Sequence, residues 1–179
     1  MRGIIFTELY ELIEEKFGFE LLDDVLMDLE LSNDGAYSAT GNYPFSELLA
    51  IVVKLHEQTE IPINDLLEVF GEYLFARLLA MHPELARTDN VLVFLEHVET
   101  YIHIEVKKLY PDAELPKFNI VSKDDKSFKF YYISSKKLHY LAKGLIQGLS
   151  NHYKQPVDIQ MGLEDDEGVF FEVTRMQEA

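Results

Sequence analysis

Residues 101–116 read YIHIEVKKLYPDAELP, and the rest of the chain is organised around this stretch. Its apolar residues extend a stripe of helical spacing, and Tyr110 with Pro111 ends the helix because proline cannot continue the backbone hydrogen bonding. His103 lies one position round the helix from that stripe. A histidine there is either a hydrogen-bonded residue at the edge of the core or the single protein ligand of a cofactor metal. The stretch by itself leaves both interpretations open.

The composition indicates a globular chain that avoids nucleic acid. Of its 179 residues 47% are hydrophobic, which predicts one folded domain over residues 1–179. The formal net charge of -16 argues against binding to nucleic acid or to anionic membranes. The lack of cysteine excludes disulfides and thiolate metal sites. No apolar run approaches the roughly 20 residues that cross a bilayer, so we expect a cytoplasmic protein without membrane insertion.

The spacing of apolar residues changes from helical to alternating at Pro116. Before it, periods near 3.6 predict helices over residues 4–17, 21–29, from 45 onward, 61–82 and about 89–109, the last capped by Asp89 or Thr88. After it, alternation predicts a hairpin over residues 118–132 and strands over 157–161 and 169–176, with a helix over about 135–153 between them. This order predicts an α+β fold, mainly helical, with an antiparallel sheet of about four strands.

Three polar residues lie at the end of the first predicted hairpin and just beyond it. If the strand continues with its period of two, Tyr132, Ser134 and Lys136 share one face, and their two hydroxyls and one ammonium could bind a carboxylate. The alternative is an ordinary strand end in which Ser134 or Ser135 caps the following helix.

Glycines interrupt two predicted helices at Gly71 and at Gly144 and Gly148. Glycine bares the helix backbone, so these positions predict a close approach by another group, either a packed helix or a cofactor. No two of the six histidines have a metal-cluster spacing on one helix face, which disfavours a multi-histidine metal site.

Taken jointly, five short motifs resemble those of the haem nitric oxide/oxygen binding family, called H-NOX, and the resemblance covers nearly the whole chain. They are Met1-Arg2-Gly3-Ile4-Ile5, His103-x-x-Val106-x-x-x-Tyr110-Pro111, Pro116, Tyr132-x-Ser134-x-Lys136 and Gly144-Leu145-Ile146. The resemblance implies that His103 is the proximal ligand of haem b, buried between helices and sheet. It implies that Tyr132, Ser134 and Lys136 bind the haem propionates and that Pro116 presses on the haem.

Lys136 departs from the family pattern, which has arginine at this position. Arginine binds a carboxylate with a planar fork, whereas lysine is a point charge on a mobile stem, so weaker propionate anchoring is expected here.

The resemblance also implies which gas is sensed. Family members that hold dioxygen stably have a tyrosine three residues before the helix glycine, and this chain has Leu141 there. The other residues that the resemblance places around the distal pocket also lack a side-chain donor: Ile5, Leu9, Leu74, Leu78 and Leu145. Such a pocket favours nitric oxide, with carbon monoxide as a further candidate, over dioxygen.

The resemblance therefore implies a stand-alone bacterial sensor and not an enzyme, since the distal wall has no evident acid-base residue. Release of His103 from the iron would carry the signal to a separate histidine kinase or cyclic-di-GMP enzyme. The alternative is a haem-free protein-interaction domain that retains the fold.

Overall fold

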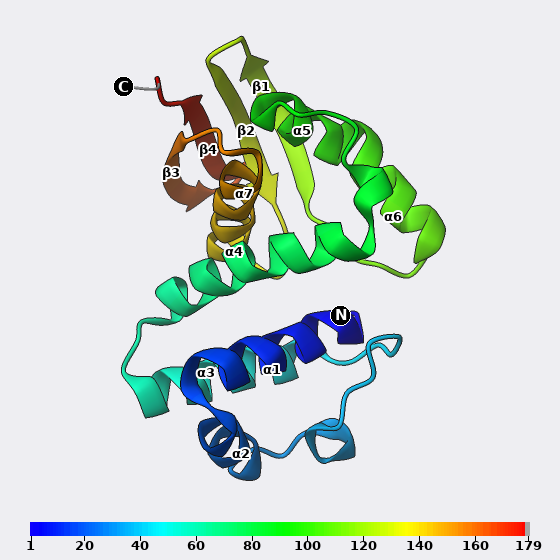
Figure 1. Cartoon of the computed structure of the whole chain (residues 1–179), viewed down its shortest axis with the longest axis vertical. Helices are drawn as coiled ribbons and strands as arrows, with labels where there is room; N and C mark the ends of the chain where they lie inside the picture. The colour runs from blue at the N-terminus through cyan, green and yellow to red at the C-terminus, as the bar shows by residue number, and fades with distance from the viewer. Residues whose placement is uncertain (178–179) are drawn as a thin grey trace.

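The computed structural model describes residues 1–177, with helices first and a sheet last along the chain (Figure 1). The N-terminal helices are α1 (Gly3–Phe17), α2 (Phe19–Met27), η1 (Ser32–Gly35), α3 (Phe45–Thr59) and α4 (Ile63–Met81). They are followed by η2 (Pro83–Leu85), α5 (Val91–His97), η3 (Val98–Ile102) and α6 (His103–Leu109). The remaining elements are β1 (Lys117–Lys123), β2 (Ser127–Ile133), α7 (His139–Tyr153), β3 (Val157–Asp165) and β4 (Gly168–Arg175). The predicted α+β fold is confirmed.

The sheet has four strands in the order β1-β2-β4-β3, and every neighbouring pair is antiparallel. Its inner face is aromatic where β2 meets β4: Phe130 pairs with Phe171, and their rings stack at 5.1 Å. Both residues are fully buried, as alternation along the strands predicts.

The buried side chains form two clusters on either side of α4. One fills the space among α1 to α4, and the other lies between the sheet, α5 and α7. Leu145 of α7 packs against both clusters. Figure 1 shows α4 running across the molecule between the N-terminal helices and the half that contains the sheet.

Helices α4 and α7 touch backbone to backbone at their glycines. A Cβ added to Gly144 would lie 2.0 Å from the carbonyl oxygen of Glu68, and one added to Gly71 would lie 2.2 Å from that of Leu141. Gly148 faces α4 in the same way, further along α7. The close approach predicted at these glycines is therefore helix packing.

The predicted helix over residues 89–109 was wrong as a regular α-helix. It consists of α5, a single π-helical segment η3, and α6. Its cap is Asn90, which accepts hydrogen bonds from the backbone N–H groups of Leu92 and Val93, whereas Thr88 accepts one from the N–H of Asn90. A π-helical segment inserts one extra residue into the helix. A search for apolar residues spaced 3.6 apart does not detect so short an insertion.

The predicted start of the last helix near Ser135 was also wrong. Strand β2 ends at Ile133, a turn follows, and α7 begins at His139 without a side-chain cap. The Ser134 hydroxyl accepts from the Lys136 N–H at 3.2 Å, which is a local serine turn and not a helix cap. Within residues 1–177, none of the helices is long and apolar enough to span a membrane.

Candidate functional site

His103 is the first residue of α6 and follows the π-helical segment directly. Its side chain is 17% exposed, and its Nδ1 lies 3.1 Å from Oε2 of Glu99. A carboxylate can only accept, so the ring proton is on Nδ1 and the lone pair is on Nε2. Burial lowers the pKa of His103, and Glu99 opposes that shift through its hydrogen bond and charge. The net effect favours the neutral imidazole that can bind a metal through Nε2.

Glu99 also ties the π-helical segment to the sheet. The same Oε2 accepts from the backbone N–H of Phe118 at 2.9 Å, and the Phe118 ring packs edge-on against the His103 ring at 5.6 Å. The imidazole is therefore oriented by a carboxylate on one side and an aromatic ring on the other. The sequence analysis missed Glu99, although an acid four residues before a candidate ligand is a recognisable signal.

The segment after α6 carries Pro116 and is attached to the N-terminus of the chain. The guanidinium of Arg2 lies 4.5 Å from the centroid of the Tyr110 ring, and Asn42 donates a hydrogen bond to Asp112. Pro116 is partly buried and directly precedes β1. The loop over residues 110–116 thus joins the His103 helix to both the N-terminal segment and the sheet.

The structure brings Tyr132 and Ser134 together, but it gives the Lys136 ammonium another partner. Tyr132 is buried on the inner face of the sheet, where burial raises the pKa of its phenol and a hydrogen bond with the Ser134 side chain opposes that shift. Lys136 lies in the turn after β2, so the period-two argument does not extend to it. Its Nζ lies 3.1 Å from Oε2 of Glu114.

The six residues predicted for a distal wall come from α1, α4 and α7, and all belong to or pack against the buried cluster that fills the space among α1 to α4. Leu9, Leu74 and Leu141 are buried, whereas the other three are partly buried: Ile5, Leu78 and Leu145. No side chain among the six carries a hydrogen-bond donor.

These residues fit a porphyrin better than a free metal ion. Within residues 1–177 no group of three or more His, Asp or Glu side chains is placed to hold an ion. A single imidazole is enough for an iron whose other ligands come from a macrocycle. The hydroxyls and the ammonium suit its carboxylates, and the leucine-rich wall suits its apolar surface.

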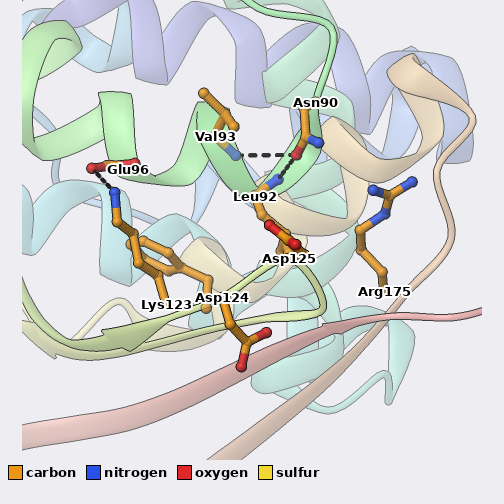
Figure 2. Close-up of a pocket in the computed structure, with 9 residues that line it drawn as sticks. Asn90, Leu92, Val93, Glu96, Lys123, Asp124, Asp125 and Arg175 are labelled. Carbon is orange, nitrogen blue, oxygen red and sulfur yellow. Dashed lines mark hydrogen bonds and ion pairs between the residues drawn. The ribbon is translucent and has the colours of Figure 1, made fainter.

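The pocket in Figure 2 lies elsewhere, among α5, the turn between β1 and β2, and the end of β4. Its volume is about 430 Å³, and it contains none of the predicted site residues. Figure 2 shows that Asn90 bonds to the backbone of its own helix and that Lys123 pairs with Glu96. Asn90 therefore caps α5, and the ion pair between Lys123 and Glu96 connects α5 to β1.

Comparison with known proteins gives a consistent result. The family model described as Haem-NO-binding matches residues 2–161. The Fe(II) unliganded H-NOX protein from K. algicida is 35% identical, with a TM-score of 0.94 over 99% of this chain and 98% of that chain. The IWP-051-bound H-NOX from Shewanella woodyi, in the Fe(II)CO ligation state, is 39% identical, with a TM-score of 0.84 over 98% and 95%. An H-NOX protein from S. oneidensis in the Fe(II)NO ligation state is 25% identical, with a TM-score of 0.91 over 99% and 100%. No curated protein matches the chain.

Proposed function

Because the chain belongs to the Haem-NO-binding family, also called H-NOX, we propose that it is a haem-based sensor that binds nitric oxide in preference to dioxygen. The observation that carries this proposal is the His103 site. One partly buried imidazole is held by Glu99 and leaves Nε2 for a metal, and no side-chain cluster in residues 1–177 offers a competing metal site. The S. oneidensis and Shewanella woodyi relatives in their Fe(II)NO and Fe(II)CO states support nitric oxide and carbon monoxide as ligands.

The proposed cofactor is haem b, held by residues at three places. His103 would bind the iron through Nε2, and Glu99 would fix the orientation of the ring. Tyr132, Ser134 and Lys136 would bind the propionates, and Pro116 would contact the macrocycle. When bound, haem would supply a ferrous iron that can bind nitric oxide or carbon monoxide.

The distal wall supports discrimination against dioxygen. Iron-bound dioxygen carries partial negative charge and is retained by a hydrogen-bond donor, whereas nitric oxide on ferrous iron depends on one far less. Leu141 stands where such a donor would be expected, and it is 8% exposed among other apolar side chains. The wall also has no acid-base group, which supports a sensor and not a peroxide-using enzyme.

Leu141→Tyr tests the assignment of the distal wall. A tyrosine hydroxyl at this position should donate to dioxygen, and one hydrogen bond of about 1.4 kcal/mol corresponds to a lifetime about tenfold longer. The measurement is the dissociation rate of dioxygen by stopped-flow absorption. Leu141→Phe is the matched control because it adds the same ring without the hydroxyl. Equal lifetimes in the two variants would show that residue 141 does not face the gas.

In the proposed signal, His103 would be released from the haem iron that it holds. His103 starts α6, α6 leads into the loop over residues 110–116, and that loop contacts Arg2 and Asn42. A change at His103 would therefore reach the N-terminal helices through covalent and packed contacts. We propose that a separate cytoplasmic protein, a histidine kinase or a cyclic-di-GMP enzyme, reads the change.

An absorption spectrum before and after adding nitric oxide tests the proposed function as a whole. Protein from haem-supplemented expression should show the Soret band of five-coordinate ferrous haem, and nitric oxide should shift it. Exposure to air should not produce a stable dioxygen spectrum. Folded but colourless protein would overturn the proposal in favour of a haem-free interaction domain.

A further inference from the structure

Glu114 is the partner of the one cation assigned to the haem propionates. It lies on the loop between α6 and β1, two residues before Pro116, and its Oε2 is 3.1 Å from Nζ of Lys136. The two side chains differ in exposure: that of Lys136 is 14% exposed, whereas that of Glu114 is 75% exposed. The lysine is therefore held in place, and the glutamate can turn into water at little cost.

Glu114 and a haem propionate carry the same chemical group. A glutamate side chain is two methylenes that end in a carboxylate, and so is a propionate on a porphyrin ring. In this structure Glu114 therefore makes the charge-assisted contact that a propionate would make with Lys136.

Positive charges surround the Glu114 carboxylate. The Met1 ammonium donates to the carbonyl oxygen of Tyr43 at 2.8 Å. Burial lowers its pKa, the charge of Lys136 lowers it further, and the charge of Glu114 opposes the shift. The hydrogen bond from Lys136 and the charges of Lys136, the Met1 ammonium and Lys107 lower the pKa of Glu114. Glu114 is therefore ionised at neutral pH and would repel an incoming propionate.

We propose that Glu114 competes with a haem propionate for Lys136, so that haem uptake replaces an internal ion pair with an ion pair to the cofactor. The inference rests on the proposed function, because haem is the competing occupant. Two effects follow from the exchange. Haem is held less tightly than Lys136 alone would allow, and the loop that carries Pro116 loses its contact with Lys136 when haem binds.

Glu114→Gln removes the competing charge and keeps the shape of the side chain. An exposed ion pair is worth up to about 1 kcal/mol, so the variant should release haem roughly two- to fivefold more slowly. The measurement is haem transfer from the loaded protein to excess apomyoglobin. Glu57→Gln is the matched control, because it also removes one exposed carboxylate from a lysine pair, that with Lys54 on α3.

A neutral porphyrin separates competition from a general structural effect. Haem dimethyl ester has no propionate charge, so Glu114→Gln should leave its rate of release unchanged. In a Lys136→Gln background, Glu114→Gln should no longer slow the release of haem, since the contested ammonium is gone.

The outcomes distinguish this inference from the proposed function. If the wild-type protein binds haem but Glu114→Gln releases it as fast as the wild type or faster, the competition is refuted and the sensor proposal stands. An equal slowing with haem and its dimethyl ester would also refute it. Failure of the wild-type protein to take up haem would refute the proposed function and the competition with it.

Discussion

His103→Gly should abolish the bond between protein and iron, and added imidazole should restore the ferrous spectrum. Nε2 of His103 is the only protein atom proposed to bind the iron, so glycine leaves no replacement there. Free imidazole can occupy the vacated volume and donate its other nitrogen to Glu99. Without imidazole we expect haem to leave at least about tenfold faster, equivalent to about 1.4 kcal/mol of lost binding. Absorption spectra titrated with imidazole and haem transfer to apomyoglobin measure the two effects.

His82→Gly is the matched control for this experiment. His82 also has Nδ1 near a carboxylate, that of Glu84 at 3.2 Å, but it lies at the end of α4, outside the candidate site. Its removal should leave the haem spectrum unchanged. An unaltered ferrous spectrum in His103→Gly would refute the assignment of the iron ligand.

Gly144→Ala should be strongly destabilising although it adds a single methyl group. In a helix interior, alanine is favoured over glycine by about 1 kcal/mol. Here the new Cβ would lie 2.0 Å from the Glu68 carbonyl oxygen and 2.9 Å from Cα of Gly71, and both belong to the backbone of α4. The two helices must separate, and overpacking of this kind costs about 1–3 kcal/mol or more. Because both clashes are with backbone atoms, we expect a cost at the upper end of this range, about 3 kcal/mol, and so a net loss of about 2 kcal/mol in the free energy of unfolding.

For a chain of this length such a loss lowers Tm by roughly 4–8 °C, which thermal unfolding followed by circular dichroism can measure. Gly162→Ala is the control, because the same methyl group would meet its nearest neighbour at 3.4 Å, an ordinary contact. Equal stability of the two variants would contradict the backbone contact between α4 and α7.

The regular elements were predictable because each has one buried face. The alternation of Phe128, Phe130 and Tyr132 correctly predicted the inner face of β2, and the predicted hairpin over residues 118–132 corresponds to β1 and β2. The helices of the first half follow apolar stripes in the same way, with Gly18 directly after α1. In these segments buried residues recur at the spacing that a helix or a strand dictates, so the secondary structure can be read from the positions of the apolar residues.

The π-helical segment could not be predicted by the same argument. An inserted residue changes the helical period over only five residues, and the Glu99 contacts that accompany it reach Phe118, on a different element. Lys136 was placed on a strand that ends three residues earlier. The ion pair between Lys136 and Glu114 depends on how the loop over residues 110–116 packs. That packing cannot be predicted from the residues next to either partner in the sequence.

The role of His103 came from the resemblance and not from periodicity. A stripe shows only that a histidine lies beside apolar residues. The structure adds that Glu99 fixes the tautomer and that burial favours the neutral ring. That role and those of the other site residues remain predictions until the variants are measured.

The glycine contact between α4 and α7 determines where the molecule can bend. No side chains separate the two backbones at this crossing, so sliding or tilting one helix against the other would cause a collision there. We therefore expect α4 and α7 to move together. A rotation of the N-terminal helices would then have to occur at the boundary where α1 and α3 pack against α4. The buried carboxylate of Glu8 on α1 crosses this boundary to Arg77 on α4, at 2.7 Å. We expect this ion pair to restrain such a rotation, so its two residues are suitable positions for variants that test it.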